Sequence, residues 1–215
     1  MGINTFENLD NDKQERVLDA AVEEFAEYGF HQASVNRMVK RLGIAKGSVF
    51  TYFGSKQGLF EYVFRHSVSL IKGPLKAARQ AEGDTFDRIR LSLVTGMDFV
   101  RRHPRLYRIY LKVLFQENVP FRETFLRQVR EYAARFLTPL LNDGIRRGEL
   151  RGDLDLDMAI FLIDGLFDRF LQAWSVPAVH PGLHGLKERD LEQRINQLME
   201  FIRRSLAALP GEPHA

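Results

Sequence analysis

Apolar residues recur at intervals of three and four along most of the chain, which is the period of an amphipathic α-helix. No segment alternates apolar and polar residues as a half-buried strand does. At the N-terminal end, the pattern predicts helices over residues 12–28, 34–42, 44–53 and 56–78, separated by glycines. The chain is therefore expected to be all-α and to begin with three short helices that pack together.

Local signals support these boundaries. Asp12 and Glu15 have the spacing of a capping box, and Ser34 can cap the second helix. Gly43 can supply the positive φ of the turn that follows. Gly73-Pro74 is expected to kink or interrupt the fourth helix, because proline lacks the backbone N–H that a helix interior needs.

The remainder of the chain is also predicted to be helical. Helices are expected at about 84–102, 105–117, 121–147, 155–174 and 187–209, with proline, glycine or asparagine in the breaks. These boundaries predict an N-terminal domain over residues 11–71 and a larger helical domain over residues 72–209. Residues 210–215 are expected to form a frayed tail.

Composition narrows the class of protein. A chain of 215 residues can bury a core without disulfides, and the absence of cysteine excludes disulfides, thiolate metal sites and cysteine nucleophiles. Residues 1–12 lack the pattern of a signal peptide, and the longest apolar run, Met158–Ile163, is too short to span a membrane. We expect a soluble, cytoplasmic protein without membrane association, metal or cofactor.

Charge is distributed unevenly along the first sixty residues. Residues 1–27 contain eight acidic and two basic side chains, whereas residues 28–60 contain five basic side chains and no acidic one. A short basic segment of this kind is typical of a surface that contacts phosphates. A solvated basic face accounts for the same pattern equally well. The basic residues are Arg37, Lys40, Arg41, Lys46 and Lys56.

The first three helices have the order of a helix-turn-helix, with the motif at about residues 34–53. Leu42-Gly43-Ile44 is the tight turn, and the following segment, Ala45–Phe53, is the candidate reading helix. Val49 and Phe53 are expected to face the core. The side chains left facing outward are small, hydroxylic or basic and could approach a base edge or a phosphate. Similar three-helix packing also occurs in proteins that never touch DNA.

Residues 14–72 resemble the DNA-binding domain of the tetracycline-repressor (TetR) family. One part of the resemblance is Phe25-x-x-Tyr28-Gly29-Phe30, and another is Ser34-Val35-x-x-Met38-Val39. The most specific part is the string from Gly43 through Ala45-Lys46-Gly47-Ser48-Val49-Phe50-Thr51-Tyr52-Phe53 to Ser55-Lys56-x-x-Leu59. Beyond this region the chain agrees with the family only in length and helical character.

The resemblance implies a homodimeric transcriptional regulator, usually a repressor, that binds a palindromic operator in double-stranded DNA. The DNA-binding residues would be Ser34, Asn36, Arg37, Lys46, Gly47, Ser48, Thr51, Tyr52 and Lys56. Lys46, Gly47, Ser48 and Thr51 would face the groove, while Tyr52 and Lys56 would hold the backbone. Phe50 stands where the family usually has tyrosine, so this position is expected to contribute packing rather than a phosphate contact.

The resemblance also implies that the larger domain dimerises and binds a small apolar effector. Candidate pocket residues are Phe99, Phe115, Phe125, Val129, Phe136, Phe161, Asp164, Phe170 and Trp174. Candidate dimer residues are Phe167, Leu171, Ile195, Leu198, Phe201 and Ile202. A well-packed core explains the same apolar residues. Asp164 and Asp168 interrupt an apolar helix and need a partner, for which Arg169, Arg90 or a residue of a second copy is a candidate.

Three functional hypotheses follow. The first is a repressor that a small apolar ligand releases from its operator. The second is a DNA-binding dimer controlled by a protein partner without a small-molecule effector. The third, an enzyme acting on a hydrophobic substrate, is disfavoured because the chain lacks a Gly-x-Ser-x-Gly elbow, a phosphate loop and a His-Glu-x-x-His pair.

Overall fold

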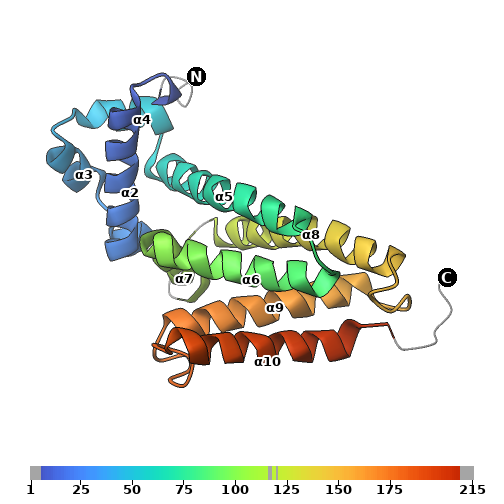
Figure 1. Cartoon of the computed structure of the whole chain (residues 1–215). Coiled ribbons are helices and arrows are strands. Elements are labelled where there is room, and N and C mark those ends of the chain that lie inside the picture. Colours follow the sequence, from blue (N-terminus) through green and yellow to red (C-terminus); the bar gives the residue numbers. More distant parts are fainter. Residues whose placement is uncertain (1–5, 116–117, 120, 209–215) are drawn as a thin grey trace. The chain divides into compact units, whose positions relative to one another are not determined.

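The computed structural model describes residues 6–115, 118–119 and 121–208, and the prediction of an all-α fold is confirmed for them (Figure 1). The predicted tail at 210–215 lies outside these residues. Within the described part, a single β-bridge joins Leu150 to Ala207. The helices are α2 (Asn11–Gln32), α3 (Val35–Leu42), α4 (Lys46–Phe53), α5 (Lys56–Gln80), α6 (Thr85–Arg102), α7 (Pro104–Phe115), α8 (Arg122–Arg146), α9 (Leu156–Ser175) and α10 (Glu188–Leu206).

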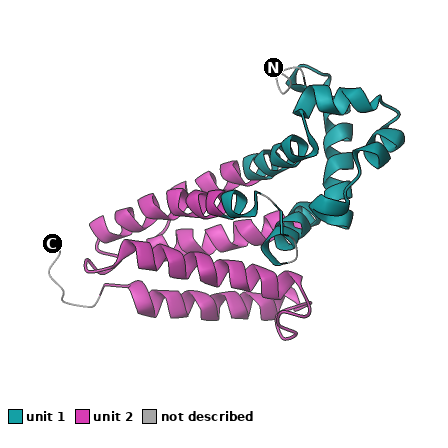
Figure 2. Ribbon diagram, turned by 180° about the vertical axis from the view of Figure 1, so that it is seen from behind, with its two compact units in different colours: residues 1–70, 102–126 teal, residues 71–101, 127–215 magenta. Residues whose placement is uncertain are grey.

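The chain forms two compact units (Figure 2). Unit 1 consists of residues 1–70 and 102–126, and unit 2 of residues 71–101 and 127–215. The chain therefore returns to unit 1 after α6, and α7 packs against α2. This division differs from a single cut between residues 71 and 72, because the packing of α7 depends on contacts distant in sequence.

The helix ends follow the predicted signals with two exceptions. Asp10, not Asp12, caps α2, because its side chain accepts a hydrogen bond from Lys13 N at 3.0 Å. Gly29 interrupts α2 with φ 68°, and Gly43 ends α3 in the left-handed conformation, both as expected. The expected interruption at Pro74 is wrong, since α5 continues through it to Gln80, while the alternative of a kink stays a prediction.

Aromatic side chains build much of the core of unit 1. The Phe25 and Phe60 rings meet edge to face at 5.0 Å, and the Phe125 ring lies 4.4 Å from that of Phe64. Phe6, which lies before the first predicted helix, is 1% exposed. Its ring lies 4.8 Å from that of Phe53, at the end of α4. The residues preceding α2 therefore help to hold α4 in place, which helical periodicity alone does not predict.

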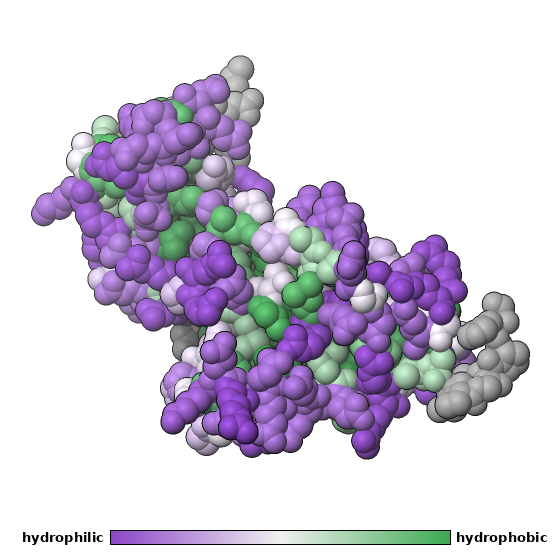
Figure 3. Space-filling view, in the orientation of Figure 1, coloured by the Kyte–Doolittle hydropathy of each residue, from purple (hydrophilic) through white to green (hydrophobic). Residues whose placement is uncertain are grey.

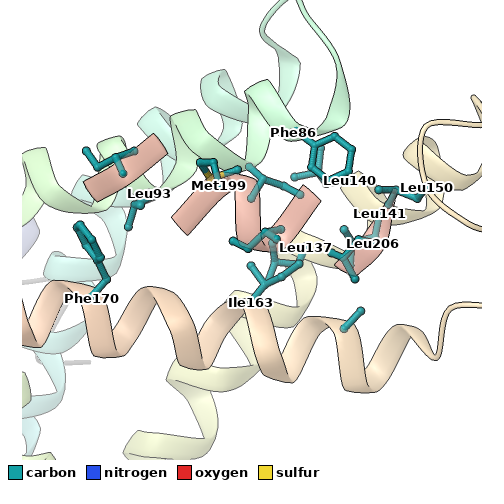
Figure 4. Close-up of a cluster of buried hydrophobic side chains, with 14 of the residues drawn as sticks. Phe86, Leu93, Leu137, Leu140, Leu141, Leu150, Ile163, Phe170, Met199 and Leu206 are labelled. Carbon is teal, nitrogen blue, oxygen red and sulfur yellow. The ribbon is translucent and has the colours of Figure 1, made fainter. Parts of the chain in front are cut away.

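Helices α6, α8, α9 and α10 build the core of unit 2 (Figure 4). Ile89, Leu141 and Ile163 are at most 2% exposed and represent three of these helices. At the end of α8, a Cβ on Gly144 would lie 2.5 Å from the Thr85 hydroxyl, so the close approach of this helix requires glycine. The helices of unit 2 thus form a core of their own.

Candidate nucleic-acid interface

Helix α4 presents three rows of side chains. Val49 and Phe53 form the inner row and are 1% and 7% exposed, as predicted. Lys46 and Phe50 form one outer row, and the Lys46 ammonium lies 5.7 Å from the centroid of the Phe50 ring. Phe50 is 40% exposed, which corrects the expectation that it mainly contributes packing.

The second outer row consists of Gly47 and Thr51. The Thr51 hydroxyl donates a hydrogen bond to the Gly47 carbonyl oxygen at 2.9 Å, and Thr51 is exposed. Ser48 and Tyr52 lie between this second outer row and the inner row and are half-buried. Most of the surface visible around α3 and α4 is hydrophilic (Figure 3). Helix α4 therefore offers a narrow exposed strip with one basic, one aromatic and one hydroxyl-bearing side chain.

Gly47 is the residue of α4 that the fold itself does not require. A Cβ at this position would meet nothing within 4 Å, and the residue lacks the positive φ of Gly43 and Gly54. By contrast, a Cβ on Gly58 would collide with the Phe53 carbonyl oxygen at 2.0 Å. Glycine in a helix costs about 1 kcal/mol relative to alanine. The packing of the fold therefore does not itself require a glycine at position 47.

A buried carboxylate joins α2 to the start of α3. Glu24 is 2% exposed and accepts a hydrogen bond from Ser34 N at 2.8 Å. Its carboxylate also accepts hydrogen bonds from the Nε and Nη2 of Arg37. Burial alone would raise the pKa of Glu24, but the hydrogen bonds from Arg37 and Ser34 outweigh it and hold this pKa below its ordinary value. The Arg37 guanidinium also stacks 3.8 Å above the Tyr28 ring. Arg37 is therefore engaged inside the unit.

The basic segment is partly neutralised by the acidic segment that precedes it. Besides the Glu24–Arg37 pair, Arg41 pairs with Glu23 at 3.1 Å. Among the described residues, neither Lys40 nor Lys46 forms an ion pair, and the Lys46 ammonium lies against the Phe50 ring. Two of the five basic residues, Arg37 and Arg41, therefore form salt bridges between α3 and α2 and do not simply form a phosphate-binding surface.

Lys56 closes the end of α2. Its ammonium donates hydrogen bonds to the carbonyl oxygens of His31 and Ala33 at 3.1 and 3.2 Å and lies 4.8 Å from the Phe30 ring. This position satisfies carbonyls that the interrupted helix leaves without partners. A lysine ammonium has three N–H donors, so one remains for an external anion. Sequence reasoning assigned Lys56 to phosphate alone and missed this internal role.

The remaining predicted DNA-binding residues lie near the start of α3. Ser34 caps this helix by accepting a hydrogen bond from Arg37 N at 3.3 Å, as predicted. Asn36 is exposed one residue into the helix. The structure therefore brings the start of α3 and the outer rows of α4 into one unit. Arg37 and Lys56 hold this arrangement through hydrogen bonds to other residues of the same unit.

The predicted pocket residues do not form one group. Phe115 and Phe125 belong to unit 1, where Phe115 is 62% exposed and Phe125 packs against Phe64. Phe161 is 68% exposed, so neither Phe115 nor Phe161 is buried in the single chain, whereas Phe125 is 6% exposed and its assignment to a pocket stays a prediction. In unit 2, Phe170 is buried in the core. The other candidates in this unit are half-buried: Phe99, Val129, Phe136, Asp164 and Trp174.

The predicted dimer residues also differ in how far they are buried. Ile195 and Ile202 are 3% and 2% exposed in the core of unit 2, so they cannot face a second copy. Leu171 lies against Gly96 of α6, with its Cδ1 3.4 Å from the position of a Cβ there. Phe167 and Leu198 are half-buried against the same core, whereas Phe201 is 60% exposed. Sequence reasoning missed the exposed Met158 and Leu162, whose spacing with Phe161 on α9 was the available signal.

Asp164 and Asp168 share one partner. Arg130 on α8 donates to Asp164 at 2.5 Å and to Asp168 at 3.1 Å, in place of the expected Arg169 or Arg90. Burial raises the pKa of Asp164 despite the nearby guanidinium. Arg90 instead pairs with Glu192 on α10. Periodicity could not identify these partners, because each pair joins helices that are distant in sequence.

Comparisons with known proteins give a consistent result. The family model of bacterial regulatory proteins of the tetR family matches residues 17–63, and that of the tetracyclin repressor-like C-terminal domain matches residues 83–207. The chain is 25% identical over 162 residues to the fatty acid metabolism regulator protein of Bacillus subtilis (strain 168), covering 75% of this chain and 83% of that protein. It is also 25% identical over 168 residues to the probable acrEF/envCD operon repressor of Escherichia coli (strain K12), covering 75% of each.

Solved structures share the fold. A TetR family transcriptional regulator from Chloroflexus aurantiacus J-10-FL is 27% identical, with a TM-score of 0.71 over 96% of this chain and 98% of that one. The regulator FadR of Bacillus subtilis in complex with stearoyl-CoA is 23% identical, with a TM-score of 0.71 over 87% of this chain and 96% of that one. None of the helices in the described part of the chain is long and apolar enough to cross a membrane.

Proposed function

The chain belongs to the tetR family of bacterial regulatory proteins, a family of transcriptional regulators and not of enzymes, and we propose that it is a homodimeric repressor of a palindromic operator. A small, largely apolar ligand would release it from the DNA. The observation that carries the DNA-binding part is Gly47, a helical glycine that lies on the exposed strip of α4 without a structural need for it.

We propose that α4 enters the major groove, which is about 12 Å wide. The first turn of α4 begins at Ala45 without a side-chain cap, so its backbone N–H groups can bind a phosphate. Gly47 lets this turn approach the DNA, while Lys46, Ser48 and Thr51 contact base edges or phosphates. Ser34, Asn36 and Tyr52 contact the DNA backbone, and Arg37 and Lys56 act chiefly by holding α3 in position.

Gly47→Ala is expected to weaken operator binding by about tenfold or more, because a methyl group would separate the α4 backbone from the DNA. The same change should raise the free energy of unfolding by about 0.5–1 kcal/mol, since alanine favours the helix. Fluorescence anisotropy with an operator that the protein selects from random duplex DNA measures the affinity, and thermal unfolding measures the stability. Gly73→Ala is the matched control, because Gly73 is also exposed and helical with nothing within 4 Å of its Cβ position.

Gly73→Ala should leave operator affinity unchanged, but it should stabilise the protein less, because a Cβ on the residue before Pro74 is disfavoured in a helix. If Gly47→Ala bound the operator as well as the unmodified protein does, the proposed approach of α4 to DNA would be wrong.

We propose that dimerisation uses an apolar face of α9 and α10, defined by Met158, Phe161, Leu162 and Phe201. These side chains are between 51% and 68% exposed in the single chain. On α9 the next turn carries Gly165, which is exposed and whose Cβ position is open, so a second copy can approach closely. An exposed group of large apolar side chains is typical of a protein interface. A two-fold dimer would present two α4 helices to successive major grooves, about 34 Å apart.

For the ligand, we propose a long-chain acyl compound bound within unit 2. Support comes from half-buried apolar residues of this unit, such as Val129, Phe136 and Trp174, and from the comparisons with regulators of Bacillus subtilis. The sequence comparison gives a fatty acid metabolism regulator, and the structure comparison gives FadR in complex with stearoyl-CoA. Control by a protein partner without a small molecule is the alternative, and the ligand experiment distinguishes the two.

Stearoyl-CoA is expected to release the protein from its operator and to raise its melting temperature. At about one hundred times the dissociation constant, stabilisation of the folded protein should reach about 2.7 kcal/mol. Mobility shift and thermal unfolding measure these effects, with coenzyme A alone as the control because it lacks the apolar chain. If stearoyl-CoA changed neither, a long-chain acyl-CoA would be excluded as the ligand and control by a protein partner would become the better hypothesis.

A further inference from the structure

Phe50 is an apolar side chain on a strip that is otherwise polar or small. Phe50 is 40% exposed as a residue, whereas Val49 and Phe53 on the inner row are almost completely buried. The fold therefore uses the two neighbours of Phe50 for packing and leaves much of this ring in water. An aromatic ring in that position carries an unfavourable hydration free energy unless another molecule covers it.

The surroundings of the ring restrict what that molecule can be. Phe50 follows Lys46 by one helical turn, and the Lys46 ammonium lies 5.7 Å from the ring centroid. A phenylalanine ring has neither donor nor acceptor, so it cannot form a hydrogen bond to a phosphate or to a polar base edge. Its partner is expected to be apolar and to lie where the lysine ammonium can still reach an anion.

We propose that Phe50 contacts the C5 methyl group of a thymine in the major groove of the operator. This inference rests on the proposed entry of α4 into that groove. The thymine methyl is the one apolar group that unmodified base pairs present there, and phenylalanine is among the side chains that suit it. Lys46, in the same row, contacts a nearby phosphate. Phe50 is thus a specificity-determining residue that favours A·T pairs at one position of each half-site.

The test removes the methyl group and nothing else. First, the full-length protein selects an operator from random duplex DNA. Each thymine of that operator is then replaced by deoxyuridine, in symmetric pairs, and affinity is measured by fluorescence anisotropy. At one symmetric pair we expect a loss of about fourfold per methyl, the value for burial of one such group. Replacement by 5-bromodeoxyuridine, whose bromine has nearly the size of a methyl group, should restore affinity.

Phe50→Ala provides the second half of the test. This variant should bind the thymine and deoxyuridine operators equally at that position, while Thr51→Ala should remain sensitive to the methyl group. Circular dichroism establishes that Phe50→Ala is folded, as expected for an exposed residue, and Phe50→Leu is the second variant if it is not. A leucine side chain can still contact a methyl group, so Phe50→Leu should keep part of the sensitivity.

The outcomes separate this inference from the proposed function. If no operator were selected, specific DNA binding itself would fail. If an operator were selected but the protein and Phe50→Ala responded alike to every deoxyuridine substitution, DNA binding would stand and the role of Phe50 would be wrong. A methyl effect that disappears in Phe50→Ala and returns with bromine would establish the contact.

Discussion

Replacing Glu24 by alanine is expected to lower the free energy of unfolding by about 3 kcal/mol, the low end of the range for breaking a buried ion pair. Glu24 is 2% exposed and binds Ser34 N and the Arg37 guanidinium at once. Alanine would leave Ser34 N without its acceptor and would remove the carboxylate partner of Arg37, whose guanidinium would keep its hydrogen bond to the Gln32 carbonyl oxygen. The low end of the range applies because the Arg37 side chain is 47% exposed, so water can solvate part of it.

Glu23→Ala is the matched control for this prediction. Glu23 is the neighbouring residue and also pairs with an arginine of α3, but both side chains of the Glu23–Arg41 pair are at least 40% exposed. An exposed pair contributes only about 0–1 kcal/mol. Hydrogen exchange of residues 34–42 and circular dichroism measure the difference. Tryptophan fluorescence would not report on unit 1, because the single tryptophan, Trp174, lies in unit 2. Equal effects of Glu23→Ala and Glu24→Ala would contradict the importance of the buried carboxylate.

The same pair makes the stability of α3 depend on pH. Because the folded pKa of Glu24 is held below its ordinary value of 4.5, the charged form stabilises the fold. This contribution is complete above the pKa of the unfolded chain and is lost as the pH falls through the lower, folded pKa. Exchange protection of residues 34–42 should therefore decrease on acidification in the unmodified protein, and by less in Glu24→Ala.

Much of unit 1 could be predicted from the sequence because its determinants are local. The turn at Gly43 needs a positive φ, the cap at Ser34 needs a side-chain oxygen, and Val49 and Phe53 follow helical spacing. Each of these signals acts within about one helical turn. The resemblance to a known family then gave the role of α4, which periodicity could not supply.

The features that the sequence did not predict depend on distant contacts. Glu24 pairs with a residue thirteen positions away, and the available signal was an acidic residue on the apolar face of α2. Arg130 finds its two carboxylates on another helix, and α7 returns to unit 1. Ile202 and Phe201 are adjacent apolar residues of α10, yet one is buried and the other exposed. Composition cannot decide which side of a helix meets its own core.

Phe161→Asp is expected to convert the dimer into a monomer at micromolar concentrations and to weaken operator binding by about a hundredfold or more. Two-fold symmetry brings two copies of Phe161 into the interface, so each dimer would lose two aromatic contacts and gain two carboxylates among apolar side chains. Linking two half-sites raises affinity by about 10²–10⁴, and a monomer loses this gain. The single chain should remain folded, because Phe161 is 68% exposed.

Light scattering coupled to size-exclusion chromatography gives the mass, and a mobility shift with the selected operator gives the affinity. Phe115→Asp is the matched control, since Phe115 is 62% exposed but lies on α7 in unit 1 and is not part of the proposed dimer face. It should leave the mass unchanged. A Phe161→Asp protein that remained dimeric would assign dimerisation to another surface. A monomeric variant with undiminished operator affinity would instead show that a single α4 suffices for binding. The exposed face of α9 and α10 would then have no part in bringing two α4 helices to one operator.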